Sequence, residues 1–283
     1  MSEDRRAEGD DGRVPLPEGV IATGFAEIDE VLGGGLRRGS LTVIGGHAGA
    51  GAAVLARQVA CRAAAEQRVR VAYLAVGAQV ADVERAAIAG HTGVRVSEIG
   101  HATAADRAAA VARIFDGRLE IDRLADRARE GVLSWAVGRA SIGDTDVLVI
   151  DCLNLLGVVD ADWTFPTSPP LDSPMMADVL RHLRVLALDR DLLVVVAADL
   201  PSVAATERGT TSDHLIAHRA ALGPAAQIAD SLLLLYRPDM WDRNDPRCGE
   251  ADVVVAKAPY CHVPTAVTLA HQLHLGRFVS MRQ

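Results

Sequence analysis

The chain has 283 residues, a net charge of −8 and 49% hydrophobic residues, which favours a globular protein with one large domain. No apolar run reaches the roughly 20 residues that a membrane-spanning helix needs, and the acidic balance argues against a general nucleic-acid binder. Four cysteines in a chain of this length do not form a disulfide framework, so we expect the reducing environment of the cytoplasm.

The pattern of apolar residues predicts strands that alternate with helices. Residues 1–17 are polar and mixed in charge, without an apolar signal segment, so we expect a disordered tail before a single domain over 18–283. The predicted elements of this domain are, in chain order, a strand over 41–46, a helix over 52–66, a strand over 69–76, helices over 80–89 and 102–114, a short strand over 118–124, a helix over 125–139, a strand over 146–156, a helix over 175–189, and strands over 192–199, 231–237, 251–257 and 265–271. The alternation predicts an α/β fold, with a mostly parallel twisted sheet, helices on both faces, and an antiparallel meander at the C-terminal end.

The segment VIGGHAGAGAAVL, Val43 to Leu55, has the spacing of a phosphate-binding loop and directly follows the first predicted strand. In such a loop, G-x-x-x-x-G-K-[ST], backbone N–H groups surround the phosphates, the lysine adds charge and the hydroxyl binds Mg²⁺. Gly46, Gly49 and Gly51 retain the glycine positions, whereas Ala52 and Ala53 replace the two side chains. A tight turn from strand to helix needs glycines for its backbone whether or not a phosphate binds.

The order of motifs resembles the RecA-fold ATPase domain of the DnaB replicative helicase family over about residues 19–281. The resemblance rests on ATGFAEIDEVLGGGLRRGSLTVIGG before the loop, on VLVIDCLNLL as the Walker B strand, and on AAQIADSLLLLYRPDMW and GEADVVVAKAPYCHVPTAVTLAH near the C-terminus. It implies a RecA-like fold, with ATP bound between two subunits of a ring. The helical N-terminal domain of that family, which binds primase, is expected to be absent.

The resemblance also implies catalytic roles that this chain fills only in part. Asp151 stands at the Walker B position, which holds Mg²⁺, but YLAVGAQVA after the second strand lacks the glutamate that orients water. In the hairpin that supplies an arginine to the neighbouring subunit, Lys257 keeps the lysine position and Pro259 replaces the arginine. Arg57, one helical turn beyond the loop, is not expected to reach back into it.

Four parts of one reaction are therefore altered, and we predict no catalytic residue, no cofactor and at most weak binding of Mg-ATP. The positions of this vestigial nucleotide site are Gly46, Gly49, Gly51, Ala52, Ala53, Asp151 and Lys257. No metal site is predicted either, because Cys248, Cys261 and the nearby histidines follow no zinc-ligand spacing.

Contacts with DNA would require basic residues that track phosphates, yet the chain has none between 140 and 180. Trp163 and Phe165, in a proline-rich segment, are predicted to bind a protein partner; packing onto the domain itself is the alternative. The polar stretch over 200–221 is interpreted as a solvated loop.

We predict a catalytically inactive DnaB-like protein that acts by self-assembly into a ring or filament, or as a scaffold or regulatory partner. Three alternatives stay open: an active helicase or ATPase with unusual site residues, a sensor that binds nucleotide without hydrolysis, and a DNA-binding module. Any Mg-dependent turnover abolished by Asp151→Ala would favour the first alternative.

Overall fold

The computed structural model describes residues 19–124, 128–156, 173–200 and 222–282. Trp163 and Phe165, the predicted partner-binding residues, lie outside these ranges. So do residues 1–17, the predicted tail. None of the described helices is both long and apolar enough to cross a membrane.

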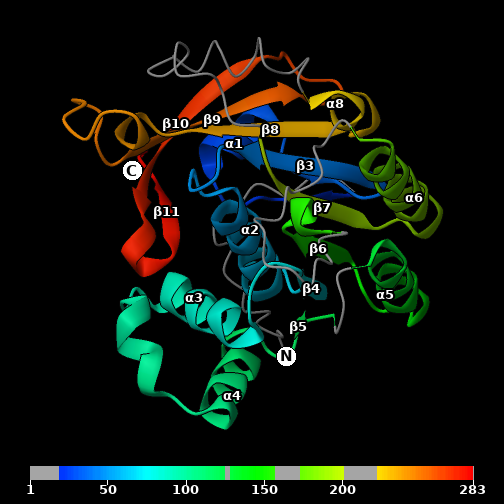
Figure 1. Ribbon diagram of the computed structural model, residues 1–283, viewed down its shortest axis with the longest axis horizontal. Coiled ribbons are helices and arrows are strands. Elements are labelled where there is room, and N and C mark those ends of the chain that lie inside the picture. The colour runs from blue at the N-terminus through cyan, green and yellow to red at the C-terminus, as the bar shows by residue number, and fades with distance from the viewer. Residues whose placement is uncertain (1–18, 125–127, 157–172, 201–221, 283) are drawn as a thin grey trace, which may run out of the picture.

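A nine-stranded sheet forms the centre of the described part of the chain, in the order β11-β10-β9-β8-β3-β7-β6-β4-β5 (Figure 1). Its strands are β3 (Ser40–Gly46), β4 (Val71–Ala75), β5 (Leu119–Asp122), β6 (Val147–Asp151), β7 (Leu193–Asp199), β8 (Ser231–Tyr236), β9 (Glu250–Lys257), β10 (Thr265–Gln272) and β11 (Arg277–Ser280). The strands from β8 to β5 run parallel to one another, whereas β9, β10 and β11 pair in antiparallel fashion. A separate pair is formed by β1 (Val20–Ile21) and β2 (Leu36–Arg37).

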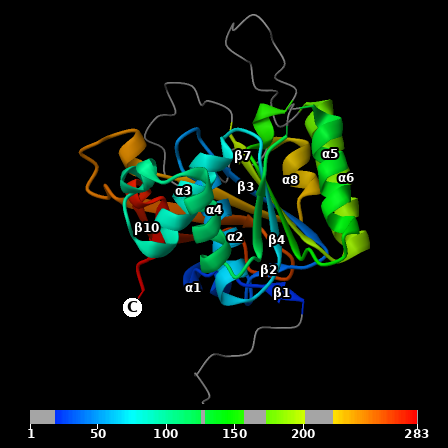
Figure 2. The same ribbon diagram turned by 90° about the horizontal axis from the view of Figure 1, so that it is seen from below.

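Helices cover both faces of this sheet, as Figure 2 shows. They are α1 (Ala26–Val31), α2 (Ala52–Glu66), α3 (Val80–Thr92), α4 (Ala104–Ile114), α5 (Arg129–Ser141), α6 (Pro174–Arg190) and α8 (Pro224–Ile228), with short 3-10 turns η1 (Val96–His101), η2 (Leu153–Leu155), η5 (Pro238–Met240) and η6 (Leu273–Leu275). Apolar residues of α1 to α4 join one core, and those of α5, α6 and α8 join the other. Alternate residues of one strand enter opposite cores, as with Val43 and Ile44 of β3, because successive side chains of a strand point to opposite faces.

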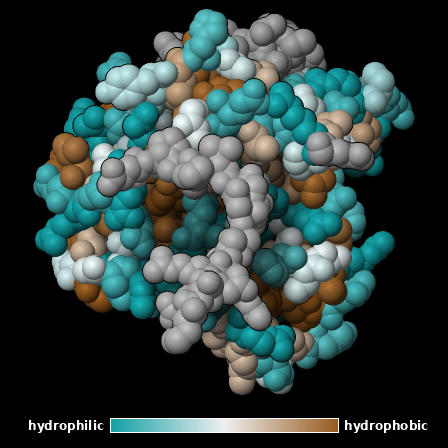
Figure 3. Space-filling view, turned by 180° about the vertical axis from the view of Figure 1, so that it is seen from behind, coloured by the Kyte–Doolittle hydropathy of each residue, from teal (hydrophilic) through white to brown (hydrophobic). Residues whose placement is uncertain are grey.

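The predicted mostly parallel sheet with a C-terminal antiparallel meander is confirmed, and the helix predicted over 52–66 coincides with α2. The strand predicted over 146–156 is confirmed in its first half as β6, but its second half is wrong, because β6 ends at Asp151 and η2 follows it. Leu153 is fully buried in that turn, so the apolar run continues past the end of the strand. On the face in Figure 3, hydrophobic residues lie in small groups between hydrophilic ones.

Candidate functional site

The glycine loop connects β3 to α2 at the carboxyl edge of the parallel strands. Gly49 and Gly51 have φ of +89° and +105°, a region that side chains rarely adopt. A Cβ on Gly51 would lie 2.7 Å from the ring of Phe278, and one on Gly46 would lie 3.1 Å from the Cβ of Ala50. The backbone of the turn therefore favours glycine at Gly49 and Gly51, whereas at Gly46 the observation is a close contact without a positive φ.

Residues that follow β8 hold the outer side of the loop. Arg237 Nη1 donates to the Gly49 carbonyl at 2.9 Å, and its guanidinium makes two hydrogen bonds, of 3.1 and 3.0 Å, to Asp239. A ring nitrogen of His271 lies 2.8 Å from the same carboxylate. Burial alone would raise the pKa of Asp239, but Arg237 and His271 hold it below its usual value. The loop backbone is thus fixed from outside by an ion-paired arginine.

Asp151, at the end of β6, is bonded inside the protein. The hydroxyl of Tyr73 on β4 donates to Asp151 Oδ2 at 2.5 Å, and both residues are buried. Burial raises the pKa of Asp151, and the Tyr73 hydroxyl and the charge of Arg57 oppose that rise. Burial also raises the pKa of Tyr73. Of these two residues, Asp151 was predicted as a site residue from the sequence and Tyr73 was not.

The sequence nevertheless carries a signal for Tyr73. A tyrosine in the middle of the apolar strand VRVAYLAV has a hydroxyl that needs a partner when the strand is buried. That partner cannot be identified from the strand alone, because Asp151 lies 78 residues further along the chain.

Polar groups at the ends of β6 and β7 also bond one another. Asn154 Nδ2 donates to the Asp199 carbonyl at 3.0 Å, and the Asp199 N–H donates to Asn154 Oδ1 at 2.6 Å. Burial raises the pKa of the Asp199 carboxyl and raises that of the Cys152 thiol to about 12. Asn154 thus joins two strand ends through its side-chain amide.

These residues do not fit a magnesium ion with bound ATP. Ala53 offers no oxygen where the loop of the resembled family has a hydroxyl, and one of the two carboxylate oxygens of Asp151 already accepts from Tyr73. Among the described residues, no group of three or more His, Cys, Asp or Glu side chains is placed to hold a metal. Gly49 and Gly51 of the loop have positive φ, but the side chains at 52 and 53 supply neither the lysine charge nor the hydroxyl that binds Mg²⁺.

The structure brings the loop glycines, Ala52, Ala53 and Asp151 to one edge of the sheet, with β7 between β3 and β6. Lys257 lies at the opposite edge, because it pairs with Leu232 at the start of β8, whereas Gly46 pairs with Leu235 near its end. Lys257 Nζ donates to three carbonyl oxygens around the end of α8, those of Ala226, Gln227 and Ala229. Within one chain, Lys257 is therefore not part of the loop site.

Arg57 points away from the loop. It is buried, and its Nη2 donates to the Gly276 carbonyl 3.1 Å away, as expected from its place one turn into α2.

The model of the DnaB-like helicase C-terminal domain family matches residues 20–280 of the chain. The replicative DNA helicase DnaB of Leifsonia xyli is 26% identical over 276 residues, covering 92% of this chain and 56% of that protein. DnaB of Mycobacterium leprae is 41% identical over 107 residues, covering 38% of this chain and 17% of that protein. The chain thus spans little more than half the length of these relatives at most.

Two solved structures have a closely similar fold. One of them, an isolated ATPase domain, superposes with a TM-score of 0.73 at 18% identity, covering 94% of this chain and 93% of that one. The other, a DnaB-like replicative helicase described with its interactions with primase, gives 0.72 at 20% identity, covering 93% of this chain and 62% of that one. At these identities the likeness establishes the RecA-like fold.

Proposed function

This chain belongs to the family of DnaB-like helicase C-terminal domains, and we propose that it is a member that does not hydrolyse ATP and acts through contacts with proteins. It would assemble with further copies of itself, as a ring or filament, or serve as a scaffold or regulatory partner.

The observation that carries the proposal is the bond between Tyr73 and Asp151, beside a loop that ends in two alanines. The carboxylate that would hold Mg²⁺ in the family is bonded within the chain, and Ala53 supplies no second ligand. A hydrogen bond to a charged group is worth about 1.5–3 kcal/mol, so the absence of the lysine and the hydroxyl weakens binding strongly. Pro259 in the place of the arginine removes a further rate factor of roughly 10³–10⁵.

The hairpin between β9 and β10 supports the assembly part of the proposal. In the resembled family this hairpin reaches the neighbouring subunit, and here it carries Tyr260, which is 93% exposed. The guanidinium carbon of Arg37 lies 5.1 Å from the centre of that ring. A large exposed aromatic side chain that packs against an arginine on one side suits a contact with another protein surface.

A nucleotide sensor is the second candidate, because the loop keeps its glycines, and Gly49 and Gly51 have positive φ. Backbone N–H groups alone can bind a phosphate. Binding without turnover would distinguish this candidate from both the scaffold and an active helicase.

The test is equilibrium binding of a fluorescent ATP analogue with Mg²⁺. The natural chain is compared with Ala52→Lys/Ala53→Thr and with the same double variant carrying Tyr73→Phe. We expect no binding of the natural chain at millimolar nucleotide, a gain in the double variant, and a further gain when Asp151 is released from Tyr73. Binding at micromolar nucleotide, or Mg-dependent turnover that Asp151→Ala abolishes, would overturn the proposal.

Assembly is tested separately by sedimentation velocity with and without nucleotide. The natural chain is expected to form oligomers that do not depend on ATP, and Tyr260→Ser is expected to weaken them. A chain that remains monomeric at all concentrations would contradict self-assembly. The remaining form of the proposal would then be a scaffold that binds a different protein.

A further inference from the structure

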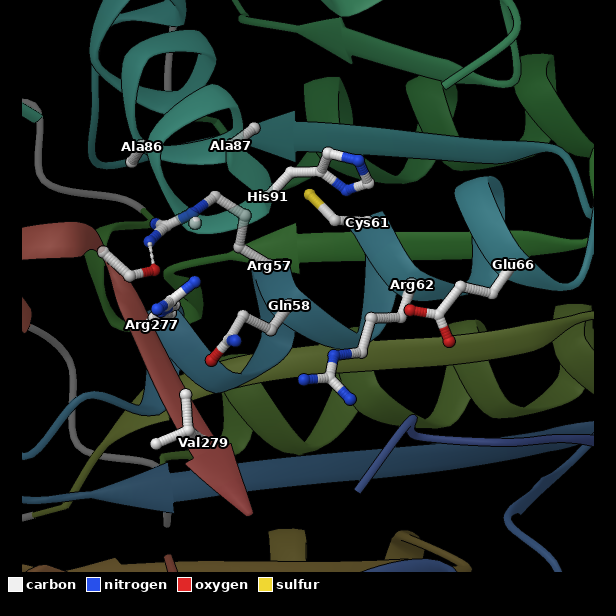
Figure 4. Close-up of a pocket in the computed structure, with 12 residues that line it drawn as sticks. Arg57, Gln58, Cys61, Arg62, Glu66, Ala86, Ala87, His91, Arg277 and Val279 are labelled. Carbon is white, nitrogen blue, oxygen red and sulfur yellow. Dashed lines mark hydrogen bonds between the residues drawn. The ribbon is translucent and has the colours of Figure 1, made fainter. Parts of the chain in front are cut away.

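A cavity of about 210 Å³ lies between α2, α3 and β11, apart from the glycine loop (Figure 4). Helix α2 contributes Arg57, Arg62 and Glu66, and His91 and Arg277 come from α3 and β11. In Figure 4 the side chains of Arg57 and Arg277 converge from α2 and β11, and Arg62 extends from a later turn of α2. Three guanidinium groups thus line one small cavity. Glu66 is the carboxylate among the residues that line it.

The three arginines retain hydrogen-bonding capacity. A guanidinium carries five N–H donors, yet within the described part of the chain Arg57 makes one hydrogen bond, from Nη2 to the Gly276 carbonyl. Arg277 likewise uses Nε, which donates to Gln272 Oε1 at 2.8 Å. Arg62 lies over the ring of Phe25, with 4.4 Å between its guanidinium carbon and the ring centre. The donors that remain are available to a ligand in the cavity.

None of these three arginines forms an ion pair with another described residue. Among the described residues, no carboxylate oxygen lies within 4.0 Å of their guanidinium nitrogens, in contrast to Arg107, which pairs with Glu84 at 2.9 Å. Asp151 and Asp29 act on Arg57 and Arg62 only through longer-range charge. Because Arg57 is 8% exposed, its charge is largely removed from water, which is unfavourable unless an anion balances it.

We propose that this cavity binds a small anion that bears a phosphate group. The planar fork of arginine matches the oxygens of a phosphate and pairs with two of them at once. The exposed residue His91 also lines the cavity. The volume is below the range of roughly 300–1,000 Å³ that is typical of pockets for drug-sized ligands, so the ligand is of the size of a phosphate or diphosphate group. This inference does not depend on whether the glycine loop binds nucleotide.

Isothermal titration calorimetry with inorganic phosphate and with pyrophosphate, at low ionic strength, tests the proposal and separates a monophosphate from a diphosphate ligand. We expect saturable binding of at least one of the two at one site per chain. Arg277→Gln should weaken that binding about tenfold or more. Glu66→Gln, at an exposed position, should tighten it because the carboxylate that repels the anion is removed. Arg113→Gln, an exposed arginine on α4 outside the cavity, is the control of equal charge and should leave binding unchanged.

The glycine loop is excluded as the binding site with Ala53→Glu, which places a carboxylate at the start of α2. Binding that survives this change and is weakened by Arg277→Gln supports the cavity. Three results would overturn the proposal: no saturable binding of either anion, binding that Ala53→Glu abolishes, or binding that neither Arg277→Gln nor Glu66→Gln alters. The unfolding curve of each variant shows whether the fold is retained.

Discussion

The hydroxyl of Tyr73 is the donor that holds the buried carboxyl of Asp151. In Tyr73→Phe that carboxylate loses its donor while it stays out of water. We expect the free energy of unfolding at pH 7 to fall by about 1–3 kcal/mol, as measured by urea denaturation. The same substitution made on Asp151→Asn should have a smaller effect, because no buried charge is left unsatisfied. An equal loss in both backgrounds would contradict a charged bond at this position.

Asp151 itself gives a pH dependence whose direction follows from its surroundings. Burial raises the pKa of Asp151 above its usual 3.8, against the opposing effects of Tyr73 and Arg57. The folded chain therefore binds this proton more tightly than the unfolded chain does. The resulting stabilisation is complete below the usual pKa and is lost as the pH rises through the folded value.

Asp151→Asn removes this dependence. We expect the variant to be more stable than the natural chain at pH 7, with a higher melting temperature, because the neutral amide avoids the cost of a buried charge. The difference should shrink toward pH 4. Thermal unfolding between pH 4 and pH 8 measures it, and a variant that is less stable at pH 7 would show that the carboxylate stabilises the fold.

Individual site residues were predictable from the sequence where the backbone requires one amino acid. The positive φ of Gly49 and Gly51 follows from the loop spacing. The contacts of Lys257 could not be predicted in this way, because its partners are carbonyl oxygens of a helix about 30 residues earlier in the chain. A long-range partner leaves no local trace in the sequence.

At the scale of elements, Lys257 of β9 stabilises α8. This helix has five residues, too few to be stable without help, and the ammonium group satisfies carbonyls at its C-terminal end. Lys257→Met should lower the free energy of unfolding by about 1.5–3 kcal/mol, measured by chemical denaturation. The control is Arg243→Met, an exposed cation with no ion pair among the described residues, for which we expect a change within about 0.5 kcal/mol. Similar losses in the two variants would contradict the cap.

The elements that the sequence predicted well are those long enough to show a period. The fifteen residues of α2 begin directly after Gly51 and coincide with the prediction. By contrast, α1 and β11, with six and four residues, were not predicted, because so few residues do not establish a period of 3.6 or 2. The strand predicted over 146–156 extended too far for a related reason, since Leu153 is apolar in a turn that packs into the core.

The order of strands belongs to the whole molecule and could not be derived from alternation alone. β4 is the next strand of the main sheet after β3 in the chain, yet β7 and β6 lie between them. A crossover that joins neighbouring strands and a crossover that passes over other strands produce the same alternation of strand and helix in the sequence. The alternation predicted the α/β class and the resemblance to the DnaB family implied a RecA-like fold, whereas the position of β3 near the centre of the sheet required the structure.

The last strand ties the C-terminal end of the domain to the loop helix. Gln58 of α2 donates to the Phe278 carbonyl at 3.0 Å and accepts from its N–H at 2.6 Å, across 220 residues of chain. The Phe278 ring is fully buried against Gly51. Loop, helix and meander should therefore unfold together.

Phe278→Ala tests this cooperativity. We expect the free energy of unfolding to fall by about 3–5 kcal/mol, with circular dichroism and tryptophan fluorescence still following one transition. Fluorescence includes Trp241, which follows η5. In the control Val185→Ala, the side chain is 56% exposed, so the change should stay within about 0.5 kcal/mol. Two separate transitions in Phe278→Ala would mean that the meander unfolds independently of α2, and the glycine loop would then owe its shape to β3 and α2 alone.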